Sequence, residues 1–83
     1  MNENESIEFK ENYTEKIYKE IIAFLNTNSG TIYIGYDDNG NLKGVNNCKD
    51  IEEKISNGIR TNIYPDARIF VSINTGKIED KEY

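Results

Sequence analysis

The feature that most constrains the fold is the run Thr31–Tyr36, which reads T-I-Y-I-G-Y. Apolar residues stand on both of its alternating faces, and most of them are β-branched or aromatic, as in a strand that is covered on two sides. The run is too short to be a helix of ordinary length. A central strand is therefore predicted, and the rest of the chain must supply a layer for each of its faces.

A helix is predicted from Ile17 to Leu25, because the apolar residues of this stretch form one stripe at helical spacing. Asn12 followed by Glu15 fits a capping box at the start of this helix. The triplet Asn28-Ser29-Gly30 fits a left-handed exit at its end. This segment is the clearest helix in the chain.

A second helix is predicted from about Cys48, with Asn47 or Asp50 as its cap. Its apolar stripe consists of Ile51, Ile55 and Ile59, which recur at four-residue spacing. The helix should end by Pro65, because the residue before a proline is pushed toward extended geometry.

Short strands complete the pattern. Ser6–Lys10 and Arg68–Ile73 alternate between apolar and polar residues, which is the period of a half-buried strand. The turn formers Asp37–Asn41 predict a β-hairpin that returns at Leu42–Val45. The tail Lys77–Tyr83 is predicted to be a frayed end or the start of a further strand.

The predicted fold class is α+β, in one domain over residues 1–83 with the order β-α-β-β-α-β, a mixed sheet, a central hairpin and two helices. A chain of 83 residues is too short for two independent cores. Hydrophobic residues at 36% and charged residues at 30% favour a folded globule over a disordered chain. No apolar run approaches the roughly 20 residues of a membrane span, and the first ten residues are acidic and polar, so a cytoplasmic protein without a membrane partner is expected.

Several kinds of site are excluded by the residues that the chain lacks. It has no His and only one Cys, Cys48, so an intramolecular disulfide, an ordinary zinc site and a His-dependent nucleophile are excluded. Gly30 and Gly35 imitate the start of a phosphate-binding loop, but Tyr36 and Asp37 follow them where that loop needs Lys and Ser or Thr. A nucleotide cofactor and P-loop ATPase activity are therefore not expected.

The charged residues leave two kinds of phosphate chemistry open. The net charge of −5 opposes nucleic-acid binding in general, so any such binding must use a local basic patch or divalent ions that bridge carboxylate and phosphate. The candidates for phosphate contact are Lys10, Lys16, Lys19, Lys43 and Arg60. The acidic residues near the ends of the predicted strands are Glu3, Glu5, Glu8, Asp37 and Asp38, and three of them brought together would suit Mg²⁺ or Mn²⁺.

Three segments in order carry a resemblance to a known family: E-N-E-S-I-E-F-K at Glu3–Lys10, A-F-L-N-T-N-S-G at Ala23–Gly30, and T-I-Y-I-G-Y-D-D-N-G-N-L-K-G-V at Thr31–Val45. The ordered set of ExxxxEFK, AFxNT and GYDD resembles the Schlafen AlbA-type domain, which is also catalogued as a divergent AAA group. Two positions depart from the family pattern, because Tyr36 replaces an aliphatic residue and Ser29 stands where a second Gly is common.

This resemblance implies a Schlafen-like fold and a nucleic-acid role. Bacterial members look like transcriptional regulators that carry a DNA-binding helical region further along the chain. In the nuclease-active branch, two Glu and one Asp form a metal-dependent RNA-cleaving triad, which maps onto Glu3, Glu8 and Asp38 with Mg or Mn as the metal. The chain stops before the final strands that family domains usually add, so the domain is expected to be truncated at its C-terminus.

Three functions follow as hypotheses. The first is a DNA- or RNA-binding module of a transcriptional regulator, which uses Lys10, Lys43 and Arg60 and forms a homodimer that doubles a weak basic surface. The second is a metal-dependent endoribonuclease. The third is a protein-interaction or dimerisation domain that uses exposed tyrosines as its contact surface. The tyrosines considered, for base stacking or for packing, are Tyr13, Tyr18, Tyr33, Tyr36 and Tyr64.

Overall fold

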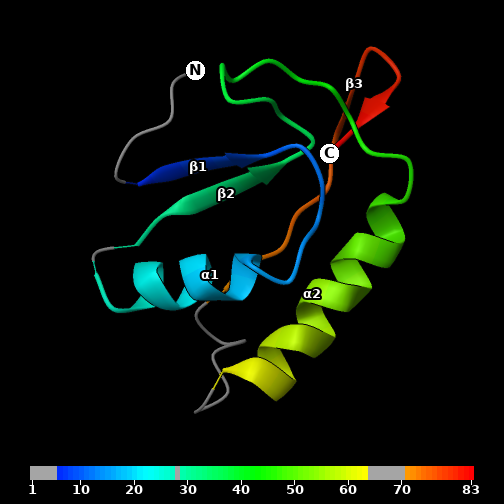
Figure 1. Cartoon of the computed structure of the whole chain (residues 1–83). Helices are drawn as coiled ribbons and strands as arrows, with labels where there is room; N and C mark the ends of the chain where they lie inside the picture. Colours follow the sequence, from blue (N-terminus) through cyan, green and yellow to red (C-terminus); the bar gives the residue numbers. More distant parts are fainter. Residues whose placement is uncertain (1–5, 28, 64–70) are drawn as a thin grey trace.

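A computed structural model of the chain describes residues 6–27, 29–63 and 71–83. It is an α+β arrangement of two helices and two small sheets (Figure 1). Its elements are β1 (Ile7–Lys10), α1 (Ile17–Leu25), β2 (Thr31–Ile34), α2 (Cys48–Asn62), β3 (Lys77–Ile78) and β4 (Lys81–Glu82). The predicted first strand, both helices and the central strand are thus confirmed.

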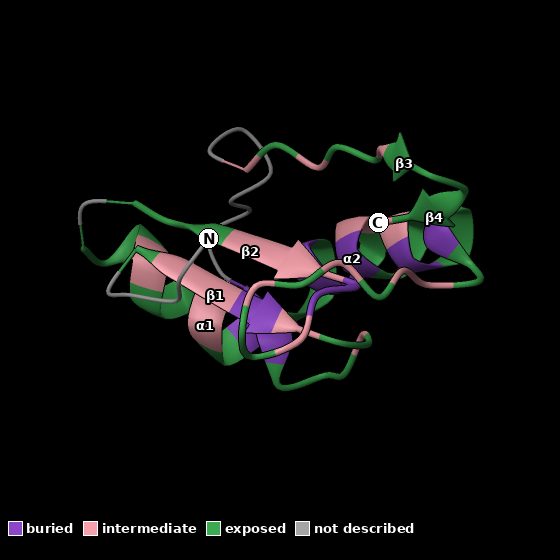
Figure 2. Cartoon of the chain, turned by 90° about the horizontal axis from the view of Figure 1, so that it is seen from above, coloured by how far each residue is buried: buried purple, intermediate pink, exposed green. Residues whose placement is uncertain are grey.

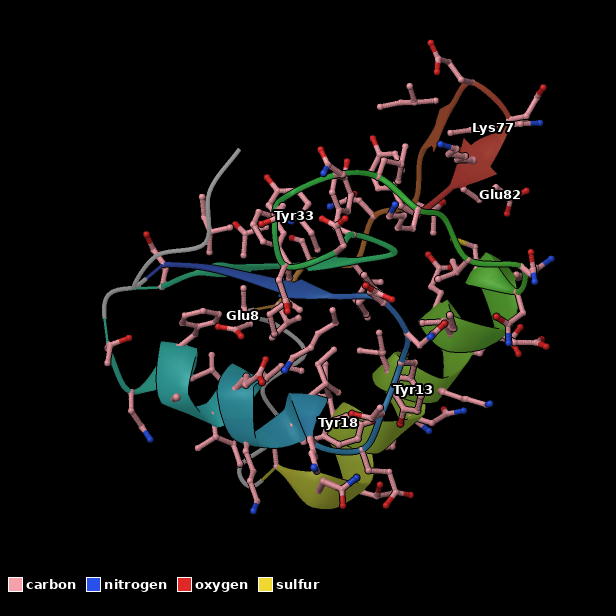
Figure 3. The ribbon with its side chains drawn as sticks, turned by 45° about the horizontal axis from the view of Figure 1, so that its top comes forward. Glu8, Tyr13, Tyr18, Tyr33, Lys77 and Glu82 are labelled. Carbon is pink, nitrogen blue, oxygen red and sulfur yellow. The ribbon has the colours of Figure 1, made fainter. Side chains whose placement is uncertain are left out.

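β1 and β2 lie side by side as a parallel pair, connected through α1. The register pairs Glu8 with Ile32 and Phe9 with Tyr33. Because paired residues in adjacent strands point to the same side of a sheet, Glu8 and Ile32 share one face while Phe9 and Tyr33 share the other. Figure 3 shows Glu8 between the sheet and α1, and Tyr33 on the opposite side of the sheet.

The main core lies between the strands and the two helices, and the helix periodicity explains which residues fill it. Ile17, Tyr18 and Ile21 of α1 are buried against the buried isoleucines of α2, of which Ile59 is fully inaccessible. Ile32 of β2 packs on the same cluster. Figure 2 shows that burial follows one stripe of α2, as the four-residue spacing of its isoleucines predicts.

The helices approach closely where α1 begins. Tyr18 donates a hydrogen bond from its hydroxyl to the carbonyl oxygen of Lys54 in α2, at 3.0 Å. A Cβ at Gly58 would collide with this Tyr18 hydroxyl, so the absence of a side chain at Gly58 allows the approach. Tyr13 also takes part in this contact between the helices, since its hydroxyl is hydrogen-bonded to that of Tyr18 at 2.7 Å.

A second, aromatic cluster covers the opposite face of the sheet. Phe9 stacks with Tyr36 at 6.0 Å between ring centroids, and Tyr36 meets Tyr33 at 5.3 Å. Strand alternation alone would place Tyr33 and Tyr36 on opposite faces. Gly35 has a φ of 99°, in the region that favours glycine, and this kink turns Tyr36 back toward Tyr33. The ring of Tyr83 packs on Tyr36 at 5.6 Å.

The order of strands differs from the predicted β-α-β-β-α-β. The predicted central hairpin is reduced to a single antiparallel bridge between Tyr36 and Leu42, because the kink at Gly35 ends β2 before the turn. Of the predicted strand Arg68–Ile73, only residues 71–73 are described, and they form no ladder. The tail 77–83, predicted to be a frayed end or the start of a further strand, forms the β3–β4 hairpin.

Of the two predicted helix N-caps, one is confirmed and one is wrong. Lys16, and not Asn12, occupies the N-cap of α1, and no side chain caps it. Asn47 occupies the N-cap of α2 as predicted, again without a side-chain hydrogen bond. At the exit of α1, Ser29 takes a φ of 127°. Among the described residues, no helix has the length and apolar character that crossing a membrane requires.

Candidate functional site

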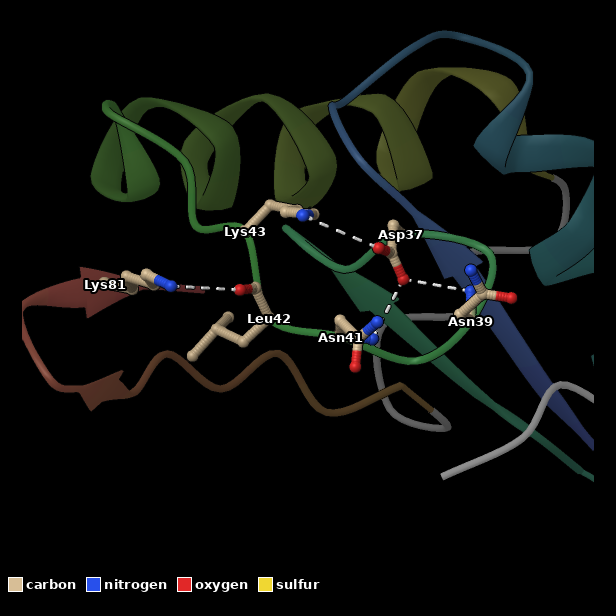
Figure 4. A network of polar contacts seen from close by, with 6 residues as sticks. All are labelled: Asp37, Asn39, Asn41, Leu42, Lys43 and Lys81. Atoms are coloured by element: carbon tan, nitrogen blue, oxygen red, sulfur yellow. Dashed lines mark hydrogen bonds and ion pairs between the residues drawn. The ribbon is translucent and has the colours of Figure 1, made fainter.

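The turn that follows β2 is organised by one carboxylate. Oδ1 of Asp37 accepts backbone hydrogen bonds from Asn39 and Asn41, each at 2.9 Å (Figure 4). Oδ2 of Asp37 lies 3.8 Å from the ammonium group of Lys43. The backbone hydrogen bond from Asn41 is the main cause that holds the pKa of Asp37 below its ordinary value. The Asp37 carboxylate therefore serves to hold the backbone of the turn in its conformation.

The neighbouring Asp38 is in a different position. Its side chain is exposed, and within the described part of the chain it makes no hydrogen bond or ion pair. Of the two adjacent acids, Asp38 is thus the one whose carboxylate is available to a ligand.

Gly35 ties this turn to the end of β1. Its backbone N–H donates to the carbonyl oxygen of Lys10 at 2.7 Å, and its own carbonyl oxygen accepts a hydrogen bond from the backbone N–H of Lys43 at 2.7 Å. The backbones of Lys10 and Lys43 therefore flank the same residue. The fold brings these two predicted phosphate-binding residues together at the backbone level, although they are 33 positions apart in the sequence.

The side chains of the two lysines diverge. Lys10 projects on the helix-facing side of β1, where its ammonium group lies 2.6 Å from Glu20 of α1 and 3.9 Å from Glu8. Lys43 projects from the turn, and 59% of its side chain is exposed. Because Lys10 is held by two carboxylates and is only 28% exposed, Lys43 is the more accessible cation of the pair.

A cation that the sequence prediction missed lies beside Lys43. The backbone N–H of Val45 donates to the carbonyl oxygen of Glu82 at 2.9 Å, which docks β4 against the segment after the turn. As a result, the ammonium group of Lys81 reaches the carbonyl oxygen of Leu42 at 3.4 Å (Figure 4). We call the surface formed by residues 42–44 together with Lys81 the Lys43–Lys81 surface. No local pattern in the sequence indicates this contact, because it depends on where the C-terminal hairpin docks.

Arg60, the third predicted phosphate-binding residue, lies elsewhere. It stands in the last turn of α2. A helix rises about 1.5 Å per residue, so Arg60 is about 18 Å along α2 from Cys48, which is the end nearer to Lys43. Lys43 and Arg60 therefore do not form one continuous patch.

The predicted metal triad is only partly covered by the structure. Glu3 lies outside the described residues. Glu8 is half-buried on β1 and faces α1 (Figure 3). Asp38 is exposed in the turn after β2. In residues 6–27, 29–63 and 71–83, no group of three His, Cys, Asp or Glu side chains is arranged to hold a metal ion. Convergence of Glu3, Glu8 and Asp38 thus stays a prediction.

The remaining candidate side chains are mainly structural. Tyr18 and Tyr36 are buried, whereas Tyr13 and Tyr33 are half-buried in contacts with other rings; Tyr64 lies outside the described residues. Cys48 is buried, and burial raises the pKa of its thiol. A raised pKa lowers the thiolate fraction, which makes Cys48 a poor nucleophile.

Comparison with known proteins identifies the family but offers no characterised relative. The search of curated proteins and the search of solved structures each found no match. The family model described as "Schlafen, AlbA_2" matches residues 3–83, which is nearly the whole chain and includes the strands, the turn and the C-terminal hairpin. On this match, the chain belongs to the Schlafen AlbA_2 family.

Proposed function

We propose that this domain is a nucleic-acid-binding module, of the kind found in transcriptional regulators, and that the Lys43–Lys81 surface contacts the phosphate backbone. The observation that carries the proposal is the contact between distant segments in which the Lys81 ammonium group reaches the carbonyl oxygen of Leu42, the residue before Lys43, at 3.4 Å. Membership in the Schlafen AlbA_2 family supports a nucleic-acid role for this surface.

The lysines of the Lys43–Lys81 surface are better placed to bind a phosphate group than to form a stable ion pair within the protein. Lys43 is 3.8 Å from Asp37, and its side chain is largely exposed, so this pair contributes little to stability and can yield to a phosphate group. The Leu42 carbonyl is a neutral partner for Lys81, which leaves the positive charge of that lysine uncompensated at this contact. Exposed Asn39 and Asn41 border the turn and supply amide groups for hydrogen bonds to phosphate or sugar.

The net charge of −5 limits this binding to a local contact. A homodimer would place two such surfaces on one nucleic acid and raise the apparent affinity without new contacts. Divalent ions would act in the same direction, because they screen the repulsion between surface carboxylates and phosphates.

The test is a fluorescence titration of short single-stranded RNA, single-stranded DNA and duplex DNA at several salt concentrations, with and without Mg²⁺. Wild-type protein is expected to bind at least one of them at low salt. In Lys43→Ala/Lys81→Ala, the slope of log affinity against log salt should fall by about 1 for each lysine removed.

A matched control separates this surface from overall charge. Lys16→Ala/Lys19→Ala removes the same charge from exposed positions at the start of α1, which lies across the sheet from the turn (Figure 1). It should keep most of the binding. Equal losses in both double variants would contradict a local surface. No binding to any probe would reject the proposal, and a nucleic-acid-inert oligomer in sedimentation would favour a protein-interaction domain instead.

A second candidate function is metal-dependent RNA cleavage through Glu3, Glu8 and Asp38, with Mg or Mn. The observation that favours it is the difference between the two adjacent acids. The Asp37 carboxylate organises the turn, whereas Asp38 is exposed and has no protein partner in the described chain.

A further inference from the structure

Four aromatic rings form a cluster on the face of the sheet that is turned away from α1, where Figure 3 shows Tyr33. Phe9 and Tyr36 are buried in this cluster, with only 2% and 8% of their surfaces exposed. Tyr33 and Tyr83 flank Tyr36 at 5.3 Å and 5.6 Å between ring centroids, each in an edge-to-face contact. Both flanking residues are half-buried, so the two outer rings keep part of their surface accessible while the two inner rings hold them in place.

The aromatic cluster adjoins the Lys43–Lys81 surface through two glycines. The carbonyl oxygen of Gly35 accepts hydrogen bonds from the backbone N–H groups of Lys43 and Gly44, at 2.7 Å and 2.8 Å. A Cβ at Gly35 would lie 3.4 Å from the Cβ of Tyr83, and a Cβ at Gly44 would lie 3.1 Å from the Cβ of Lys81. Lys81 and Tyr83 therefore pack on the same short stretch of backbone that carries Lys43.

The C-terminal hairpin fixes Tyr83 relative to Lys81. The backbone N–H and carbonyl oxygen of Tyr83 both pair with Gly76, each at 3.0 Å, and a Cβ at Gly76 would collide with the Tyr83 ring. Because side chains alternate along a strand, Lys81 and Tyr83 point to the same side, while Glu82 between them points to the other. An ammonium group and a ring thus share one side of this strand, and the intervening carboxylate is turned away from them.

Accessible rings beside accessible lysines match the chemistry of unpaired nucleotides. An unpaired base offers a flat face that stacks on an aromatic ring, while its phosphate is attracted to a neighbouring cation. In a duplex the bases are stacked on one another, so only the lysines would find a partner. Stacking also contributes affinity that the net charge of −5 does not oppose.

We propose that Tyr33 and Tyr83 stack the bases of a single-stranded nucleic acid whose phosphates lie on the Lys43–Lys81 surface. This inference rests on the proposed function and narrows it to unpaired strands, of RNA or of DNA. The lysines supply the salt-dependent part of the affinity, and the two rings supply the part that depends on the presence of bases.

An abasic strand separates these two contributions. Short oligomers of uridine, of deoxyuridine and of abasic deoxyribose with the same number of phosphates are titrated by fluorescence anisotropy at low salt, together with a deoxyuridine–deoxyadenosine duplex. Wild-type protein is expected to bind a strand that carries bases at least about fivefold more tightly than the abasic strand or the duplex. The two strands that carry bases differ only in the 2′-hydroxyl, so their comparison distinguishes RNA from DNA.

Variants of the two tyrosines test the role of the rings. Tyr33→Leu and Tyr83→Leu remove a ring but keep an apolar side chain, so each should reduce the preference for bases and leave the affinity for the abasic strand unchanged. Tyr33→Phe and Tyr83→Phe keep the ring and should keep the preference. Lys43→Ala/Lys81→Ala should weaken binding of the strands with and without bases alike. Circular dichroism checks that each variant is folded.

A measurement on wild-type protein does not depend on the folding of any variant. In NMR spectra, the ring-proton resonances of Tyr33 and Tyr83 should shift when the deoxyuridine strand is added, and should stay in place with the abasic strand. The ring of Tyr13, which is hydrogen-bonded at the contact between the helices, should be unaffected by either strand.

The outcomes distinguish a failure of stacking from a failure of nucleic-acid binding. Lysine-dependent binding with equal affinity for strands with and without bases would overturn this inference and leave the proposed function standing. Tighter binding of the duplex, or equal losses in the Phe and Leu variants, would also overturn it. Absence of binding to every probe would overturn the inference and the proposed function together.

Discussion

The hydroxyl of Tyr18 in α1 donates a hydrogen bond to the carbonyl oxygen of Lys54 in α2, and this contact fixes how the two helices cross. Since the single proton of Tyr18 goes to Lys54, its oxygen accepts from the hydroxyl of Tyr13. The pKa of Tyr18 is raised first by burial and then by the hydrogen bond with Tyr13, which keeps the hydroxyl protonated as a donor. Lys54 also lies over the Tyr13 ring, 5.8 Å from its centroid.

Tyr18→Phe is expected to lower the free energy of unfolding by about 1 to 2 kcal/mol, because it removes the bond between the helices and leaves the Tyr13 hydroxyl without its acceptor. Tyr13→Phe is the matched variant, since it removes only the outer hydrogen bond and should cost about 0.5 to 1 kcal/mol. Urea denaturation followed by circular dichroism measures both. A larger cost for Tyr13→Phe than for Tyr18→Phe would contradict the described donor order.

Ser29→Gly is expected to stabilise the protein by about 1 kcal/mol. Ser29 has a φ of 127°, where a side chain is strained, and relief of that strain exceeds the extra entropy of glycine in the unfolded chain. The control is Asn12→Gly, at an exposed position before α1 with no positive φ, which should lower stability by a few tenths of a kcal/mol. Thermal unfolding compares the two variants with wild type, and destabilisation by Ser29→Gly would show that the backbone there is unstrained.

Lowering the pH should reduce the free energy of unfolding, in part because the Asp37 carboxylate becomes protonated. The pKa of Asp37 is lower in the folded chain than its ordinary value of 3.8, mainly because of the backbone hydrogen bond from Asn41. A depressed folded-state pKa means that the contribution of Asp37 is complete above about pH 4 and is lost as the pH falls through the folded-state value. Asp37→Asn should therefore be less stable than wild type at pH 7, and this difference should shrink toward pH 2.

Asp38→Asn serves as the control for that titration, because the exposed Asp38 carboxylate organises no part of the turn. Its unfolding free energy should follow that of wild type across the same pH range. Denaturant unfolding at a series of pH values gives all three curves. A constant gap between wild type and Asp37→Asn down to pH 2 would contradict the role assigned to Asp37.

If the domain cleaves RNA, Asp38→Ala should abolish the activity while the fold is retained. The reason is that Asp38 would be a metal ligand, and removal of one ligand from a three-carboxylate site removes the metal-activated water. Cleavage of a labelled RNA is measured in Mg²⁺, in Mn²⁺ and in a chelator, and circular dichroism checks the fold. Lys16→Ala should retain wild-type cleavage. Activity that survives both the chelator and Asp38→Ala would come from a contaminating nuclease.

Much of the fold could be predicted because the signals for it are local. The isoleucine spacing of α2 and the apolar stripe of Ile17–Leu25 place both helices correctly, since a helix buries residues that are neighbours along its own axis. The central hairpin could not be predicted in detail. A turn does form, but the hydrogen bond from Gly40 to the Asp37 carbonyl oxygen centres it on Asp38 and Asn39. The positive φ of Gly35 ends β2 early, and only the Tyr36–Leu42 bridge remains.

The candidate site was less predictable than the fold. Lys43 was found because it follows a recognisable turn. Lys81 was missed because its position depends on the bond between Val45 and Glu82, which joins residues 37 positions apart. Lys10 was proposed for phosphate contact from its place on a polar strand face, yet that face is turned toward α1, where Glu20 pairs with Lys10.

The amino-acid sequence by itself determined where the helices and the first two strands form, because periodicity and turn chemistry act between residues close together in the chain. The tertiary structure alone decided which charges meet. Ion pairs and backbone contacts such as Lys10–Glu20 and Lys81–Leu42 join segments that folding brings together, and strand pairing and helix packing set their geometry. For that reason, Lys81 could be identified only once the C-terminal hairpin had been placed beside the turn.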